Sequence, residues 1–292
     1  MNFLDAEALA QLKNLRLSRR RQRTEGLFSG GHPSTRFGFA QEFAHHREYV
    51  PGDELKFLDW RASARRDRPF VKLFEEDVAL HTSALLDASG SMGYQASGAR
   101  SKWRDACSLA EALSFLFLSE GDAVGLVTFD VKPGEFLPAR SQLTHLELID
   151  SLLAKIEPKG ETDLGATLRL VSRRLTRRSL VFLVSDLLGP AEAILEVVHT
   201  LRSRKNEVWV VQVLDPMERD LTLEGPVQFE GIEDASTLRC EVSLLRKAYR
   251  DEFEKRQRLY QAGFHRLGVP YAVHCTDRPW FESLRGLLGA LA

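Results

Sequence analysis

The chain has 292 residues, of which 43% are hydrophobic and 28% are charged, the composition of an ordinary globular protein. Lys and Arg number 40 against 41 Asp and Glu, so the overall charge does not indicate a nucleic-acid or membrane partner. The three cysteines lie far apart and form neither a disulfide framework nor a zinc-ligand spacing. Because no apolar run is long enough to span a membrane and no signal peptide is recognisable, we expect a cytoplasmic protein.

Residues 1–25 predict a short helix with a basic end. Leu4, Ala8, Leu12 and Leu15 recur at helical spacing, and five arginines follow within Arg16–Arg23. An arginine cluster without interleaved aromatic residues is more typical of a solvated helix end than of a nucleic-acid surface. Nucleic-acid binding through this cluster is kept as an alternative function.

Residues 26–78 form a second segment, in which most of the chain has no clean helical or strand period. Charged and aromatic residues alternate through Glu42–Arg65, and only Phe70–Phe74 predicts a strand. Such a segment must satisfy its polar groups by specific pairing. We therefore expect a fixed, hydrogen-bonded layer docked on the core of the next domain, with a partner surface as the alternative.

Residues 79–292 alternate between predicted strands and helices, which is typical of an α/β domain with a doubly wound, mostly parallel sheet. Strands are predicted at 82–87, 123–129, 134–138, 180–185, 208–214 and 269–275, with 134–138 as a short edge strand. Helices are predicted at 102–119, 146–156, 164–175, 191–204, 243–267 and 280–291. A hairpin insertion is expected at about 216–241.

The longest predicted helix, at 243–267, carries an apolar stripe. Its members are Leu245, Tyr249, Phe253, Tyr260 and Phe264. A stripe of this kind normally packs on the core, so we expect it to be buried, with a partner helix as the alternative.

Oxygen-bearing side chains follow the ends of two buried strands. Asp87, Ser89 and Ser91 stand at alternate positions at the end of the first, and Asp186 follows another. Thr162 lies in a glycine-containing loop between them. Because ligands of open α/β sheets collect at the carboxyl ends of the strands, we expect these five side chains to converge. Carboxylate and hydroxyl oxygens suit a hard divalent cation, so the pattern predicts a Mg²⁺ or Mn²⁺ site.

These motifs, in this order, resemble the metal-ion-dependent adhesion site of von Willebrand factor A-type domains. The run Gly121–Phe129 is also similar to the second strand of that family. The resemblance implies a von Willebrand A-like, Rossmann-like fold and a non-enzymatic protein-interaction function. It further implies that the metal binds a carboxylate of the partner protein, which would make the interface sensitive to chelators.

A second group of motifs lies upstream of the first strand. It comprises Gly-x-His-x-Ser, Glu-Phe, Arg-Glu-Tyr-x-Pro-Gly-Asp, Asp-Trp and Ser-Ala-Arg. With the site loops, these motifs resemble a bacterial family of unknown function that has a von Willebrand A-like domain and is often encoded beside MoxR-type AAA+ ATPases. The resemblance implies that such an ATPase, or its client, is the partner. Lys56, Ala40 and Glu161 depart from the family pattern, but none of them replaces a predicted ligand.

One enzyme is the alternative to an interaction module, a Mg²⁺-dependent phosphatase of the haloacid-dehalogenase type. It also uses an Asp after the first strand, a Thr and a distal Asp. That chemistry usually needs an acid–base carboxylate two residues after the nucleophile, where this chain has Ser89. The sequence therefore favours a protein without enzymatic activity and without a small-molecule substrate.

Overall fold

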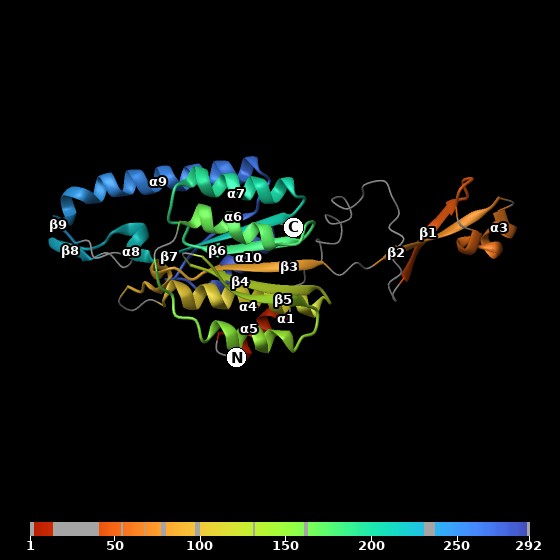
Figure 1. Cartoon of the computed structure of the whole chain (residues 1–292), viewed down its shortest axis with the longest axis horizontal. Coiled ribbons are helices and arrows are strands. Elements are labelled where there is room, and N and C mark those ends of the chain that lie inside the picture. Colours follow the sequence, from red (N-terminus) through yellow and green to blue (C-terminus); the bar gives the residue numbers. More distant parts are fainter. Residues whose placement is uncertain are drawn as a thin grey trace. The chain divides into compact units, whose positions relative to one another are not determined.

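The computed structural model describes residues 3–13, 41–53, 55–66, 68–76, 80–96, 100–130, 132–160, 163–230 and 237–290. These residues belong to two compact units. The smaller unit contains residues 41–76, and the larger contains the N-terminal helix together with the described residues from 80 onwards (Figure 1). The arginine cluster Arg16–Arg23 and the predicted ligand Thr162 lie outside the described residues.

A six-stranded sheet forms the centre of the larger unit, in the order β10-β7-β6-β3-β4-β5 (Figure 1). The strands are β3 (His81–Asp87), β4 (Ala123–Phe129), β5 (Pro133–Arg140), β6 (Leu180–Ser185), β7 (Glu207–Leu214) and β10 (Tyr271–Cys275). All neighbours pair in parallel except β4 and the edge strand β5, which are antiparallel. The chain runs outward from β3 to β5 and then returns to β6, so the strand order reverses between β3 and β6. The predicted doubly wound, mostly parallel sheet is confirmed.

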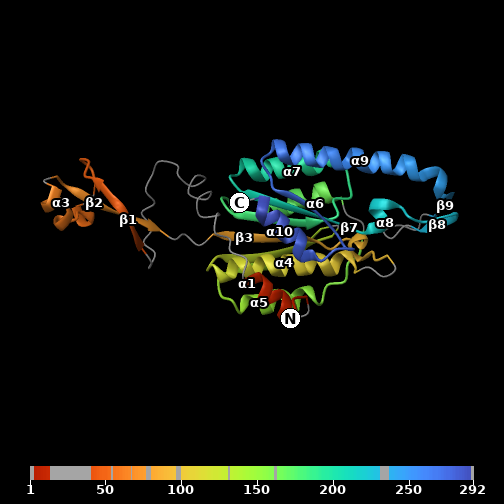
Figure 2. The same cartoon turned by 180° about the vertical axis from the view of Figure 1, so that it is seen from behind.

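Helices cover both faces of this sheet (Figures 1 and 2). One face carries α1 (Ala6–Lys13), α4 (Lys102–Ser119), α5 (His145–Leu153) and α10 (Trp280–Ala290). The other carries α6 (Leu164–Arg174), α7 (Ala191–Ser203) and α9 (Val242–Arg266). Side chains alternate along a strand, so Ala84 and Leu86 of β3 belong to the first core and Leu85 to the second.

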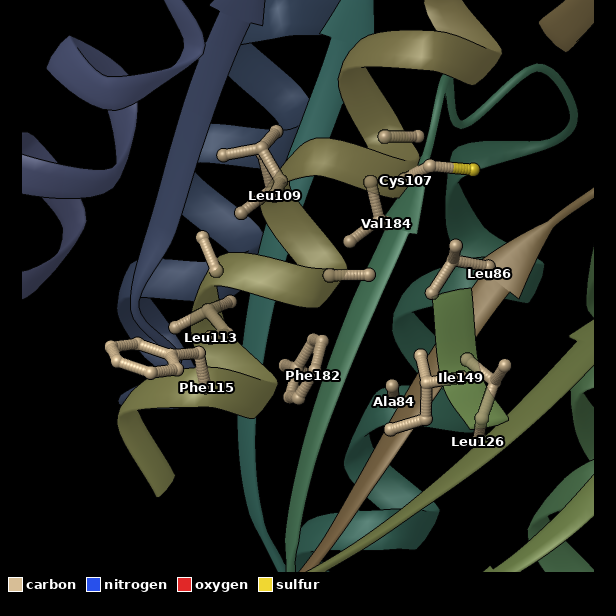
Figure 3. Close-up of a cluster of buried hydrophobic side chains, with 14 of the residues drawn as sticks. Ala84, Leu86, Cys107, Leu109, Leu113, Phe115, Leu126, Ile149, Phe182 and Val184 are labelled. Carbon is tan, nitrogen blue, oxygen red and sulfur yellow. The ribbon is translucent and has the colours of Figure 1, made fainter. Parts of the chain in front are cut away.

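The first core is organised around α4, which is buried along nearly its whole length. Figure 3 shows Leu109 and Leu113 of this helix beside Phe182 and Val184 of β6. A helix that is buried on nearly every side needs neighbours all round it, and α1, α5 and α10 supply them together with the sheet. This packing fixes the first turn of α4, which reaches the carboxyl end of the sheet.

The smaller unit is a hairpin with short helices. Strand β1 (Gln41–Glu48) pairs antiparallel with β2 (Phe70–Glu76), and a 3₁₀ helix (Leu55–Phe57) and α3 (Trp60–Arg66) lie between them in the chain. The sequence predicted only the strand that corresponds to β2; β1 and α3 were not predicted, because their residues follow no clean helical or strand period. Docking of this unit on the core stays a prediction.

The chain between β7 and α9 forms α8 (Pro216–Asp220) and an antiparallel hairpin of β8 (Pro226–Glu230) and β9 (Thr237–Glu241). Tyr260 and Phe264 in the second half of α9 are fully buried, whereas Leu245 and Tyr249 in its first half are 41% and 37% exposed. The expectation of a wholly buried stripe is therefore wrong for the first half. That half lies against α8 and β9 rather than the sheet (Figure 2).

No helix in the described part of the chain is both long enough and apolar enough to cross a membrane.

Candidate metal centre

Three of the predicted ligands lie together where β3 ends. Asp87 is the last residue of the strand and is only 2% exposed, and the chain then enters a 3₁₀ helix at Gly90–Gly93. The Asp87 carboxylate accepts a hydrogen bond from the backbone N–H of Ser89 at 3.0 Å. The hydroxyl oxygens of Ser89 and Ser91 are 3.1 Å apart, and both residues are buried. The end of β3 and the turn that follows it thus present one carboxylate and two hydroxyls within five residues.

Asp186, the fourth predicted ligand, follows β6, the strand beside β3. Its carbonyl accepts a hydrogen bond from Gln212 Nε2 at 2.9 Å, and the next residue, Leu187, has a left-handed φ of 56°. That conformation costs roughly 1–3 kcal/mol for a residue with a side chain. The Tyr260 hydroxyl donates to the Leu187 carbonyl at 2.8 Å, so α9 holds the turn that orients Asp186.

Ser185 links the ends of the two strands. It is the last residue of β6, and its hydroxyl donates to Asp87 Oδ2 at 2.6 Å while accepting from the Leu187 N–H at 3.0 Å. Sequence reasoning passed over Ser185. The available signal was its place at the end of a buried strand, directly before a predicted ligand.

The carboxylates of Asp87 and Asp186 are close enough to affect each other. Burial, and then the negative charge of Asp186, raise the pKa of Asp87 to about 7, although hydrogen bonds from Ser185 and Ser89 act in the opposite direction. Two buried carboxylates that repel each other favour a cation between them.

Lys102 brings a positive charge to one side of this centre. It is the first residue of α4, fully buried, and its Nζ lies 2.8 Å from Asp186 Oδ2 and 2.5 Å from Glu218 Oε1 in α8. Burial alone lowers the pKa of Lys102, but the two carboxylates outweigh burial and the net effect is a raised pKa. No motif predicted this group of three charged side chains, because its members come from three distant segments of the chain.

Helix α8 is held in place by a capping box at the end of β7. Asp215 accepts from the Met217 N–H at 2.8 Å, and its own N–H donates to Glu218 Oε2 at 2.9 Å. The second carboxylate oxygen of Asp215 accepts from the Ala96 N–H at 3.0 Å, in the loop after β3. Glu218 is therefore fixed from both sides, with one oxygen on its own helix cap and the other on Lys102.

The loop that contains Thr162 approaches the same place. The Lys159 N–H donates to the Ala88 carbonyl at 3.0 Å, and the Gly90 N–H donates to the Gly160 carbonyl at 3.0 Å. The backbone thus joins the loop to the Asp87 turn two residues before Thr162. Because Thr162 itself lies outside the described residues, its role as a ligand stays a prediction.

The donor set fits a hard divalent cation. Neighbouring ligands of an octahedral Mg²⁺ ion, each bound at about 2.1 Å, lie about 3 Å apart, close to the 3.1 Å between the Ser89 and Ser91 hydroxyls. Asp87, Asp186 and Glu218 are acidic, and the single ammonium group of Lys102 is shared between the last two. Among the residues described, no group of three or more His, Cys, Asp or Glu side chains could hold a metal.

The fold and this oxygen-rich cluster define a doubly wound α/β protein with a polar centre at the switch point of its sheet. A family model described as "Protein of unknown function DUF58" matches residues 45–262. The chain belongs to the DUF58 family. It is similar to the uncharacterized proteins Mb1516 of Mycobacterium bovis and Rv1480 of Mycobacterium tuberculosis, each 27% identical over 290 residues, with 96% of this chain and 88% of the relative covered.

Solved structures with a similar chain path include the conserved hypothetical protein BatB from Bacteroides thetaiotaomicron, with 19% identity and a TM-score of 0.43. An aerotolerance-related membrane protein from Bacteroides fragilis has 18% identity and a TM-score of 0.46. Each match covers 73% of this chain and 98% of the other. The SpRpn10 VWA domain has 11% identity and a TM-score of 0.43, with 73% and 95% covered. At such identities the likeness concerns the fold alone, and the strand order carries the assignment of the fold.

Proposed function

We propose that the chain is a divalent-metal-dependent protein-interaction module without enzymatic activity. Mg²⁺ or Mn²⁺ would be held by Asp87, Ser89, Ser91, Thr162 and Asp186 and would bind a carboxylate of a partner protein. The observation that carries the proposal is the joint burial of Asp87, Ser89 and Ser91 from β3 and Asp186 from β6 at the switch point.

The bound ion would supply a positive charge that accepts an anionic oxygen from outside the chain. The chain's own residues orient and shield its ligands. Ser185 holds Asp87 through a 2.6 Å hydrogen bond, and Lys102 holds Asp186 at 2.8 Å. Partners of this kind fix the direction of a ligand and tune the affinity of the site.

The proposed partner is a MoxR-type AAA+ ATPase or its client. Support for this partner comes from the upstream motifs, which resemble those of proteins often encoded beside such ATPases. The DUF58 family model describes a protein of unknown function and names no partner, so the proposed partner rests on the upstream motifs alone.

The geometry gives no support to the phosphatase alternative. The position two residues after Asp87, where that chemistry needs an acid–base carboxylate, holds the Ser89 hydroxyl, 3.1 Å from the Ser91 hydroxyl. Nucleic-acid binding through Arg16–Arg23 stays an untested alternative, since the cluster lies outside the described residues.

Co-purification tests the proposal. The tagged chain would be mixed with the MoxR-type ATPase encoded nearest to it, in Mg²⁺ and again in excess chelator, as wild type and as Asp87→Asn. We expect the ATPase to be retained by the wild type in Mg²⁺ and lost in chelator or with the variant. Asp130→Asn is the matched control, because Asp130 follows β4 at the same sheet edge and accepts only a local hydrogen bond from the Lys132 N–H among the contacts described.

Retention that is indifferent to both chelator and Asp87→Asn would sink the metal-bridged interface. Failure of the ATPase to bind under any condition would remove this partner and leave the metal centre to be judged by direct titration.

A further inference from the structure

The ion pair beside the candidate metal centre is unusually placed. The side chain of Lys102 is fully buried, and its ammonium group bridges Asp186 and Glu218, which lie on different elements. Lysine is almost never fully buried unless it is paired. Buried ion pairs add little to stability, since apolar residues of similar size often serve as well or better. Stability is therefore a weak reason for a lysine at this position.

The position of Lys102 has a consequence for any ion at the centre. Its Nζ lies 2.8 Å from Asp186 Oδ2, so a metal that uses Asp186 would share this carboxylate with a fixed cation. Two cations that share one carboxylate repel each other, and low-dielectric surroundings strengthen the repulsion. Without a partner carboxylate, the metal would bind less tightly than at a site that lacks Lys102. Once bound, it would be less fully neutralised by Asp186 and would keep more of its positive charge.

Glu218 opposes this effect. Its Oε1 lies 2.5 Å from the Lys102 Nζ, so the ammonium group is divided between Asp186 and Glu218. The capping box of α8 fixes Glu218 in this position through its other oxygen. Lys102 on α4 and Glu218 on α8 thus set the balance between the affinity of the site for the metal and the positive charge that the bound metal keeps.

We propose that Lys102 makes metal binding and carboxylate binding mutually dependent. It weakens the site for a divalent cation alone and strengthens the loaded site for an anionic oxygen, such as a partner carboxylate. This inference rests on the metal-dependent function proposed above. Binding linkage is reciprocal, so a carboxylate must tighten metal binding by the factor by which metal tightens carboxylate binding.

The test is a calorimetric titration of Mn²⁺ into metal-stripped protein, in acetate and in chloride of equal ionic strength. For the wild type we expect tighter Mn²⁺ binding in acetate. Lys102→Met should bind Mn²⁺ about tenfold more tightly in chloride, because the repelling charge is gone, and should lose most of the acetate effect. Glu218→Gln should weaken Mn²⁺ binding in chloride and enlarge the acetate effect, because Lys102 then acts on Asp186 alone.

Lys102→Met leaves Asp186 and Glu218 buried without their cation, so this variant can fail to fold. The double variant Lys102→Met/Glu218→Gln removes one positive and one negative charge and is compared with Glu218→Gln. Circular dichroism of each metal-free protein checks the fold. Mn²⁺ should bind about tenfold more tightly to the double variant than to Glu218→Gln.

Equal Mn²⁺ affinities with and without Lys102, or a wild-type affinity that is the same in acetate and chloride, overturn the inference while leaving the metal site in place. A wild type that binds no Mn²⁺ in either buffer overturns the proposed function and this inference together.

Discussion

At the scale of single residues, the two carboxylates of the centre are held by different groups. Each carboxylate accepts one backbone N–H, from Ser89 for Asp87 and from Leu188 for Asp186, but Asp87 also accepts from the Ser185 hydroxyl whereas Asp186 accepts from the ammonium group of Lys102. An ionised carboxylate offers about four lone-pair sites, so these bonds leave room for an ion at both residues. The hydroxyl on Asp87 is the contact that one substitution removes most cleanly.

Ser185→Ala should weaken Mn²⁺ binding about tenfold, because supporting hydrogen bonds of ligands typically contribute 10- to 100-fold to metal affinity. Calorimetric titration measures the change. Ser114→Ala is the matched control, since Ser114 is also buried but its hydroxyl donates to the Ala110 carbonyl within α4. Equal affinities for the two variants would show that Ser185 does not position Asp87.

Glu111 gives a pH-dependent test that is independent of the metal centre. It is fully buried in α4, and burial, followed by the charge of Asp150, raises its pKa from 4.5 to about 9. Between these values the folded chain keeps a proton that the unfolded chain has lost. The free energy of unfolding must therefore fall as pH rises through this window, by at most about 1.4 kcal/mol per pH unit for one group.

Glu111→Gln should remove that slope and make the protein more stable than the wild type at about pH 8. Urea unfolding at several pH values between about 5 and about 8.5 measures it. Parallel pH profiles for the two proteins would mean that Glu111 ionises normally in the folded state.

At the scale of elements, helices and strands with a clear apolar pattern could be predicted from the sequence. Elements held together by pairs of polar side chains could not. The bounds of α4, β4 and β6 match the predicted ranges, because each is apolar throughout or along a wide face. Strand β1 and helix α3 are rich in charged and polar residues and show neither a clean strand period nor a clean helical period. What holds them is pairing across the smaller unit, which a one-dimensional pattern does not show.

The Asp-Trp motif of the smaller unit illustrates this. Asp59 accepts from the backbone N–H groups of Arg61 and Ala62 at 3.0 and 3.1 Å, and contacts His46 Nε2 at 2.9 Å. Trp60 is 73% exposed within this unit. The first residue of the motif therefore builds the unit, while the second is presented on its surface.

Asp59→Ala should lower the unfolding midpoint, because it removes the cap of α3 and the contact to β1. Trp60→Ala should change the free energy of unfolding by less than about 0.5 kcal/mol, as for other exposed positions. Thermal unfolding followed by circular dichroism compares the two. A loss with Trp60→Ala as large as that with Asp59→Ala would show that Trp60 makes a buried contact.

At the scale of the whole molecule, the place of the centre follows from the strand order. Alternating strands and helices predicted a doubly wound sheet, and in such a sheet the ends of β3 and β6 meet at the switch point. Asp87 and Asp186 could therefore be brought together from sequence alone. Lys102 and Glu218 could not, because the turn of α4 and the capping box of α8 that aim them depend on packing between distant segments.

The most direct test of the metal centre is calorimetric titration of Mg²⁺ and Mn²⁺ into metal-stripped protein, beside the variant Asp87→Ala/Asp186→Ala. We expect one site in the wild type and none in the variant. The ion should also raise the melting temperature of the wild type alone, because a ligand that binds only the folded state stabilises it. Binding of equal strength by both proteins, or no binding by the wild type, would contradict a cation site at the ends of β3 and β6.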